Sequence, residues 1–198
     1  QRETLLRDIS HELRSPLTRL RLALALAQRQ DHGAARDHLQ RIEMEADRLE
    51  SLIAQVLDLA RINTGQQGTN RRVDLFELVD TVVADARYEQ PDRAIDWSSG
   101  TGCYVQGDAG ALTSAIENVV RNALNHSPPG QAIELALEAT PENRILLRVA
   151  DRGPGVPEPD LERIFEPFFQ VEPSRDHVSS GFGVGLAISA RVLHMHGG

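Results

Sequence analysis

The stretch DISHELRSPLTRLRLALALA, residues 8–27, decides how the chain begins to fold. Its apolar residues recur at steps of three and four, and they continue a series that starts slightly earlier. The series is Leu6, Ile9, Leu13, Leu17, Leu20, Leu24 and Ala27. This spacing keeps the side chains on one stripe of a helix. One polar residue in this region, His11, is a candidate functional residue. A lone histidine on such a helix is, however, most often a solvated or core-edge residue.

A second apolar series predicts a second long helix that folds back on the first. Its members are Leu39, Ile42, Ala46, Leu49, Ile53, Val56 and Ala60. The stretch QDHGAA, residues 30–35, joins the two helices. A hairpin of two helices leaves much of its apolar stripe in water, so we expect two copies of the chain to form a four-helix bundle.

The stretch GQQGTNRR, residues 65–72, ends the helical periodicity and is the predicted linker. We therefore expect a helical hairpin over residues 1–64 and a second domain over 73–198. The second domain should mix helix and sheet: helices near 75–89, 109–124, 158–166 and from 184 onward, and strands near 94–99, 103–108, 132–139 and 144–151. Asp108 is the expected N-cap of the second of these helices. The predicted fold class is α+β.

Composition excludes several classes of protein. The 198 residues carry a net charge of −8, which argues against nucleic-acid binding. The single cysteine, Cys103, permits no internal disulfide and is expected to be a small buried residue. No apolar run is long enough to span a bilayer. The first residue already lies inside a helical pattern, so we expect the chain to be a piece of a longer protein.

The stretch DRGPGV, residues 151–156, places Asp151 at the end of a predicted strand, followed by Gly153 and Gly155. A buried carboxylate there could accept a hydrogen bond from the exocyclic amine of adenine, and glycines let the backbone approach a flat ring. An ordinary tight turn explains the same pattern.

The stretch SSGFGVGLAI, residues 179–188, places Gly181, Gly183 and Gly185 before a helix. Free N–H groups at a helix start bind phosphate oxygens. The stretch lacks the Gly-Lys-Ser/Thr of a P-loop, and a flexible loop is the alternative.

In ENVVRNALNHS, residues 117–127, Asn118 and Asn122 lie four apart and therefore on one helix face. Amide oxygens so arranged can complete the coordination of a nucleotide's Mg²⁺. Asn125 and His126 are equally explained as C-cap residues.

His11 itself has the properties of a nucleophile, because a neutral imidazole carries a free lone pair near neutral pH. Glu12 is placed to take the ring proton as a new bond forms, and Pro16 loosens the helix one turn later.

Five stretches together resemble one family. SHELRSPL, ENVVRNALNHS, DRGPGV, FEPFF and GFGVGLAI occur in the order and at the separations typical of bacterial two-component sensor histidine kinases. The motif sequences are most similar to those of the envelope-stress kinases, and the resemblance covers nearly the whole chain. It implies a dimerisation and histidine-phosphotransfer hairpin, then an ATP-binding α/β sandwich of the gyrase, chaperone and histidine kinase (Bergerat) type.

The resemblance also implies roles for single residues. His11 is the expected phosphoacceptor and Glu12 its acid–base neighbour, and Ser15 stands at a position linked to dephosphorylation of the partner. Asp151 is the expected adenine reader, and Asn118 and Asn122 the expected Mg²⁺ and phosphate contacts. The remaining expected nucleotide contacts are Arg121, Gly153, Gly155, Gly181, Gly183 and Gly185. Phe165, Phe168 and Phe169 are expected to anchor a lid, unless they are core residues, as we expect of at least one.

ATP and Mg²⁺ are the implied cofactors. The implied partners are a second copy, bound through the hairpin, and the receiver domain of a response regulator. The implied location is the cytoplasmic portion of a bacterial inner-membrane protein, attached by segments outside this chain.

The chain departs from the family pattern at several positions. Arg121 or Arg175 is left to balance phosphate charge, because Asn125 and His126 replace a frequent basic residue and a frequent tyrosine. The chain also ends at HMHGG, where relatives continue into further strands, and His194 and His196 are interpreted as C-terminal surface residues.

A kinase is favoured over an ATP hydrolase because of one position. Hydrolytic relatives carry a water-activating glutamate where this chain has Asn118, and Glu117 lies about 100° further round the helix. The alternatives are an ATP-hydrolysing member of the superfamily and a dimer that binds a partner without catalysis.

Overall fold

A computed structural model describes residues 16–27, 35–63, 70–99, 102–142, 144–171 and 182–198. The chain divides into two compact units, residues 1–61 and 62–198, and each is described by itself. No helix in the described part of the chain is long and apolar enough to cross a membrane.

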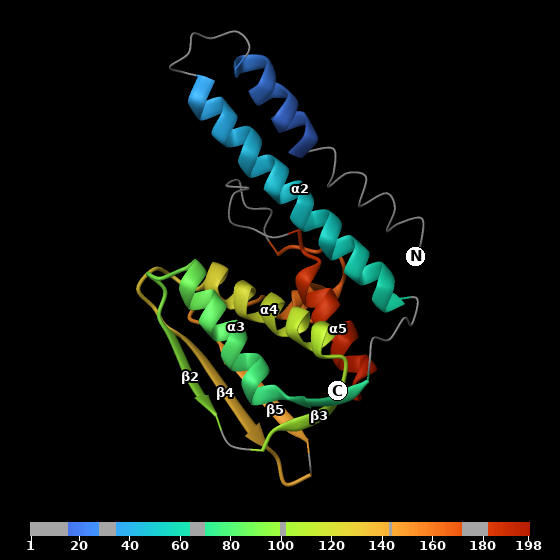
Figure 1. The fold of residues 1–198 in the computed structure, drawn as a ribbon. Helices are drawn as coiled ribbons and strands as arrows, with labels where there is room; N and C mark the ends of the chain where they lie inside the picture. The colour runs from blue at the N-terminus through green and yellow to red at the C-terminus, as the bar shows by residue number, and fades with distance from the viewer. Residues whose placement is uncertain (1–15, 28–34, 64–69, 100–101, 143, 172–181) are drawn as a thin grey trace. The chain divides into compact units, whose positions relative to one another are not determined.

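The first unit contains the two expected helices (Figure 1). Residues 16–27 are helical, and α2 spans Ala35–Asn63. The two helices are joined by a bidentate ion pair, in which Arg19 Nε and Nη2 donate to the two carboxylate oxygens of Glu45 at 2.6 and 3.1 Å. The helical hairpin is therefore confirmed over its described residues.

The two apolar series are not the residues that the hairpin buries most deeply. Leu52 and Leu59 on α2 are buried, as are Pro16 and Ala23 on the facing helix, and none of these four belongs to either series. Series members Leu17, Leu24, Leu39 and Ile53 stay between 43 and 57% exposed. These exposures agree with the expectation that a single hairpin leaves much of its apolar stripe in water, because contact with one neighbouring helix covers only part of an apolar face.

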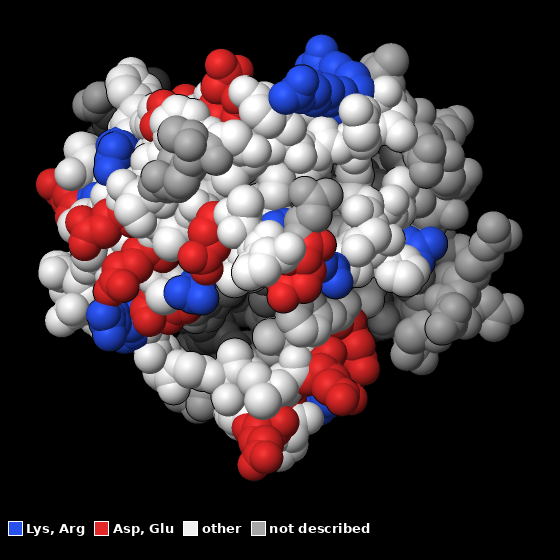
Figure 2. All heavy atoms as spheres, turned by 90° about the horizontal axis from the view of Figure 1, so that it is seen from below, with Lys and Arg blue, Asp and Glu red and all other residues white. Residues whose placement is uncertain are grey.

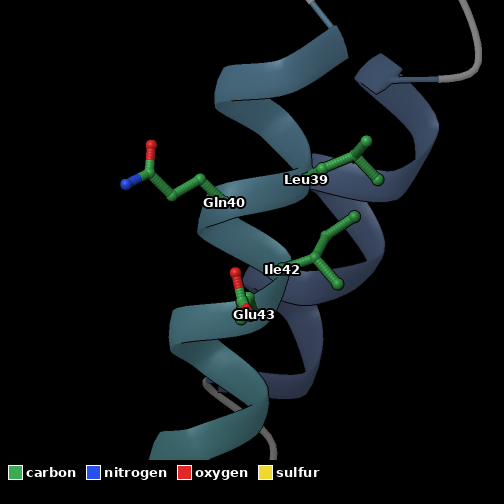
Figure 3. Close-up of a pocket in the computed structure, with 4 residues that line it drawn as sticks. All are labelled: Leu39, Gln40, Ile42 and Glu43. Carbon is green, nitrogen blue, oxygen red and sulfur yellow. The ribbon is translucent and has the colours of Figure 1, made fainter.

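A hollow of about 550 Å³ lies on the exposed side of α2 and is lined by Leu39, Gln40, Ile42 and Glu43. Figure 3 shows Leu39 and Ile42 projecting to one side of the helix and Gln40 to the other. The hairpin thus leaves apolar side chains next to polar ones at its surface.

The second unit begins with a strand that the sequence did not predict. Strand β1, Arg71–Asp74, pairs antiparallel with β3, Tyr104–Gly107, with Val73 opposite Val105. Arg71 and Arg72, assigned to the linker, therefore belong to the sheet. Their polar side chains gave no strand pattern, and the strand forms because β3 supplies its hydrogen-bond partners.

A three-stranded sheet forms one layer of this unit. Strand β4, Ile133–Ala139, lies between β2, Ile95–Ser99, which is parallel to it, and β5, Ile145–Ala150, which is antiparallel. In β4 the buried side chains alternate with exposed or half-buried ones, as expected of a strand with one covered face.

Three helices form the other layer, on one side of the sheet (Figure 1). They are α3, Leu75–Glu89, α4, Ala109–His126, and α5, Gly185–Met195. The core between the layers includes Val79, Val120, Leu135 and Ile188, all nearly inaccessible to solvent. Cys103 is buried as predicted. The helix expected near 158–166 is instead two 3₁₀ helices, η1, Glu158–Asp160, and η2, Arg163–Phe165, in a proline-containing stretch.

Charges of both signs are mixed on the face of the molecule that Figure 2 shows. Figure 2 shows acidic side chains spread over the face seen from below, with basic side chains scattered among them. Two cross-strand ion pairs, Arg148 with Glu138 and Arg152 with Glu134, join β5 and the residues after it to β4. Exposed pairs of this kind contribute little to stability.

Candidate nucleotide-binding site

Helix α4 carries the two asparagines of the expected site. Its N-cap is Asp108, whose side-chain oxygen accepts a hydrogen bond from the Ala111 N–H at 3.1 Å, as predicted. One face of the helix packs into the core through Leu112, Ala115, Ile116, Val120, Ala123 and Leu124. Asn118 and Asn122, four residues apart and half-buried, lie beside that face.

The start of α5 lies against Asn118. The hydroxyl of Ser189, which is 3% exposed, is shared between the carbonyl oxygens of Ala115 on α4 at 2.8 Å and Gly185 on its own helix at 3.1 Å. A Cβ added at Gly185 would lie 3.0 Å from Asn118 Oδ1. The structure therefore brings together the glycine segment and the first asparagine, which the family resemblance assigns to one nucleotide site, and Ser189 is a contact that the sequence did not reveal.

Gly183 requires glycine for two reasons. Its φ of +70° lies in the left-handed region, and a Cβ there would lie 2.5 Å from the carbonyl oxygen of Phe169. The Phe168 N–H donates to the Gly183 carbonyl at 2.8 Å and closes the contact. Gly181, the third glycine of this stretch, lies outside the described residues.

Asp151 follows β5 directly and holds a tight turn. Its Oδ1 accepts a hydrogen bond from the Gly153 N–H at 2.7 Å. The carboxylate is exposed, so the expectation of a buried carboxylate was wrong, because the turn carries Asp151 beyond the edge of the sheet. Gly155 has a φ of +75° with open space around it.

The Asp151 turn packs against the end of α4. The backbone N–H of Arg152 donates to the hydroxyl of Ser127 at 3.1 Å, and a Cβ on Gly153 would lie 2.7 Å from the His126 carbonyl oxygen. Ser127 is the C-cap of α4, so the sequence-based alternative that gave this role to Asn125 or His126 was wrong. The asparagines and Asp151 thus belong to one connected region along α4.

Glu117 faces α3 rather than the glycine segment. Burial raises the pKa of its carboxyl above the ordinary 4.5, the charge of Arg121 opposes this, and the charges of Asp85 and Glu89 on α3 add to the increase. Neighbouring Asn118 points to α5, so the two side chains occupy different sides of α4, as the helix geometry predicted. Arg121, an expected phosphate contact, acts on Glu117, and its role toward a phosphate stays a prediction.

The three phenylalanines of FEPFF are not core residues. Phe165 is 48% exposed, Phe168 adopts a φ of +67°, and the ring of Phe169 lies 4.1 Å from the Arg163 guanidinium carbon. Phe168 and Phe169 are half-buried, so the expectation that at least one of the three is a core residue was wrong. Among the residues that the structure describes, the buried aromatic side chain is that of Phe182, at 5% exposure.

His196 is an anchor rather than a surface residue. Its Nε2 accepts a hydrogen bond from the Asp108 N–H at 3.1 Å, and its Nδ1 lies 2.7 Å from the Val192 carbonyl oxygen. The ring therefore ties the end of α5 to the start of α4. His194 is exposed, as expected.

The residues that could hold a nucleotide's Mg²⁺ are Asn118 and Asn122, because amide oxygens are suitable ligands for this cation. A side chain at position 185 would crowd Asn118 Oδ1, which the glycine avoids. Among the described residues no cluster of three or more His, Cys, Asp or Glu side chains is suited to hold a metal. Of the other expected residues, His11, Glu12, Ser15 and Arg175 lie outside the described part of the chain.

Comparisons with known proteins agree with this arrangement. Residues 1–65 match the family described as His Kinase A (phospho-acceptor) domain, and residues 107–198 match Histidine kinase-, DNA gyrase B-, and HSP90-like ATPase. The chain is similar to the Sensor histidine kinase CpxA of Escherichia coli K12, with 38% identity over 99% of this chain and 42% of the relative.

Solved structures give the same result. A mycobacterial sensor histidine kinase, MprB, has 32% identity and a TM-score of 0.58 over 65% of this chain and 81% of that one. Full-length ShkA, solved in complex with AMPPNP, has 29% identity and a TM-score of 0.66 over 98% of this chain and 41% of that one.

These matches cover a phosphoacceptor-type hairpin and an ATPase-type sandwich in one chain. The chain belongs to the sensor histidine kinase family, and its second unit is of the Bergerat type. It spans less than half the length of the curated CpxA relatives that it matches.

Proposed function

We propose that the chain is the catalytic core of an ATP-dependent protein-histidine kinase. It phosphorylates His11 and then passes the phosphoryl group to an aspartate in the receiver domain of a response regulator. The observation that carries the proposal is the position of Asn118, which lies against Gly185 while Glu117 is turned toward α3. An amide cannot take a proton from water, so the site favours transfer to a supplied nucleophile over hydrolysis.

The nucleotide is held by groups along α4 and at its two neighbouring loops. Asp151 accepts a hydrogen bond from the exocyclic amine of adenine, and its exposure leaves the carboxylate accessible to the base. Gly183 and Gly185 bring backbone N–H groups close to the phosphates, with Gly181 and Arg121 as further contacts. Asn118 and Asn122 would hold the Mg²⁺, which would supply positive charge to neutralise the phosphates.

The first transfer is a substitution at the terminal phosphorus of ATP. A ring nitrogen of neutral His11 attacks it, the bond to the bridging oxygen of ADP breaks, and a nitrogen–phosphorus bond forms. Glu12 takes the proton that the ring loses. In the second transfer the aspartate oxygen of the regulator replaces the histidine nitrogen. Ser15, one turn after His11, is the position for hydrolysis of the regulator's phosphoaspartate.

The hairpin forms a homodimer in this proposal. Apolar side chains on both helices remain exposed in the single chain, and the hollow beside Leu39 and Ile42 adds to this surface. Packing two hairpins into a four-helix bundle would cover them. The chain would be the cytoplasmic part of a membrane-attached sensor, with attachment through segments outside it.

The phosphoacceptor is tested with terminally labelled ATP. The chain should acquire a label that is lost in acid and stable in alkali, and His11→Gln should abolish it. The exposed surface histidine variant His194→Gln is the matched control and should be labelled like the wild type. A label that survives His11→Gln refutes the proposal, and so does rapid phosphate release without labelled protein.

A further inference from the structure

The last turn of α4 lacks the two backbone N–H donors that residues 128 and 129 would normally supply. Pro128 and Pro129 follow the C-cap, and proline has no N–H to give to a carbonyl one turn back. The Ser127 N–H still closes on the Ala123 carbonyl at 3.0 Å. The carbonyl of Leu124, which would face residue 128, has no backbone donor at that position.

Arg93 supplies the missing donor from a distant part of the chain. Its Nη2 donates to the carbonyl oxygens of both Leu124 and Ser127, the latter at 2.7 Å. A guanidinium at a helix C-terminus also lies at the negative end of the helix dipole. Arg93 therefore fixes the end of α4 relative to β2, which begins two residues later.

The end of α4 in turn fixes the Asp151 turn. Ser127 is only 5% exposed, and its hydroxyl accepts the Arg152 N–H from the residue directly after Asp151. Gly153 packs so closely on the His126 carbonyl that a Cβ would lie 2.7 Å from it. A chain of contacts thus runs from Arg93 through the carbonyls of α4 and the hydroxyl of Ser127 to the turn.

We propose that Arg93 and Ser127 are positioning residues that set the base selectivity of the nucleotide site. The inference rests on the proposed function, in which the Asp151 carboxylate reads adenine. In the proposed function neither Arg93 nor Ser127 contacts the nucleotide. Discrimination between adenine and guanine depends on where the carboxylate stands, and displacement of the turn weakens the hydrogen bond that only adenine can donate.

The test compares the affinities for Mg·ADP and Mg·GDP by calorimetry on the whole chain. Ser127→Ala and Arg93→Met should each lower the ADP-to-GDP preference about fivefold, as expected for one weakened hydrogen bond. Ser127→Thr keeps the hydroxyl and should retain the preference, and Arg93→Lys should restore part of it.

Arg87→Met is the matched control. Arg87, on α3, also donates through Nη2 to a backbone carbonyl, that of Ile95 at 2.7 Å, but this acceptor belongs to β2 and not to the end of α4. Its loss should reduce the free energy of unfolding and leave the ADP-to-GDP preference unchanged.

The outcomes separate the two proposals. A wild-type chain that binds ADP and GDP equally refutes the role of Asp151, and this inference with it. A wild-type preference for ADP that persists in Ser127→Ala and Arg93→Met, or that falls equally in Arg87→Met, refutes the positioning role alone.

Discussion

Substitution of Gly183 by alanine tests the contact that holds the glycine segment against the residues after η2. The new Cβ would lie 2.5 Å from the Phe169 carbonyl oxygen, 3.0 Å from the Phe168 carbonyl carbon and 3.1 Å from the Phe169 nitrogen. All three atoms belong to the backbone, so no side-chain rotation can relieve the clash. The two segments must separate.

The expected loss has two parts. Alanine at a φ of +70° costs about 1 kcal/mol of backbone strain. Separation of the segments breaks the 2.8 Å hydrogen bond from the Phe168 N–H to the Gly183 carbonyl, which costs about 1 kcal/mol more. With some lost packing, Gly183→Ala should lower the free energy of unfolding by about 2–3 kcal/mol.

Gly155→Ala is the matched control, because Gly155 has a φ of +75° but no atom within 4 Å of a Cβ. It should show the strain alone, about 1 kcal/mol. The assay is urea unfolding without nucleotide, followed by the fluorescence of Trp97, the single tryptophan of the chain, which lies in β2 of the second unit. Equal losses in the two variants would refute the argument, because they would show that the contact with Phe169 adds nothing.

Three further predictions concern single side chains. Burial raises the folded-state pKa of Glu117, so the contribution of its carboxyl to stability is present below pH 4.5 and is lost as the pH rises through the raised pKa. Glu117→Gln should therefore be more stable than the wild type at neutral pH and similar to it below pH 4.5. The measurement is the free energy of unfolding as a function of pH. Asp151→Asn should weaken Mg·ADP binding at least about tenfold in calorimetry, and an unchanged affinity would mean that adenine binds elsewhere. His196→Ala removes the acceptor of the Asp108 N–H and should lower the free energy of unfolding by about 1–2 kcal/mol, against under about 0.5 kcal/mol for exposed His194→Ala; equal losses would contradict the anchoring role.

Local sequence signals predicted most of the secondary structure. The helix over 75–89 was predicted at its observed ends, and the structure adds that Asp74 is its N-cap. The N-cap at Asp108 and the strand that became β4 were also predicted from the sequence. Strand β1 was not, because a strand of four mostly polar residues depends on the partner that it pairs with rather than on its own pattern.

The sequence predicted which residues belong to the candidate site, but not how they are arranged in space. The spacing of Asn118 and Asn122 fixes a common helix face, and the different directions of Glu117 and Asn118 follow from the helical turn. The exposure of Asp151, the burial of Phe182 and the anchoring by His196 did not follow, because each depends on the element packed against the residue.

The sequence by itself determined the long helices, the N-cap at Asp108, the order of the glycine and asparagine motifs and the family that they define, since these depend on near neighbours along the chain. Only the tertiary structure decided that Gly185 meets Asn118 and that Arg93 and Ser127 connect the end of α4 to the Asp151 turn. Such contacts join residues far apart in sequence. They form only when helices and sheet pack in three dimensions, where close approach of backbones and unpaired carbonyls selects the partners.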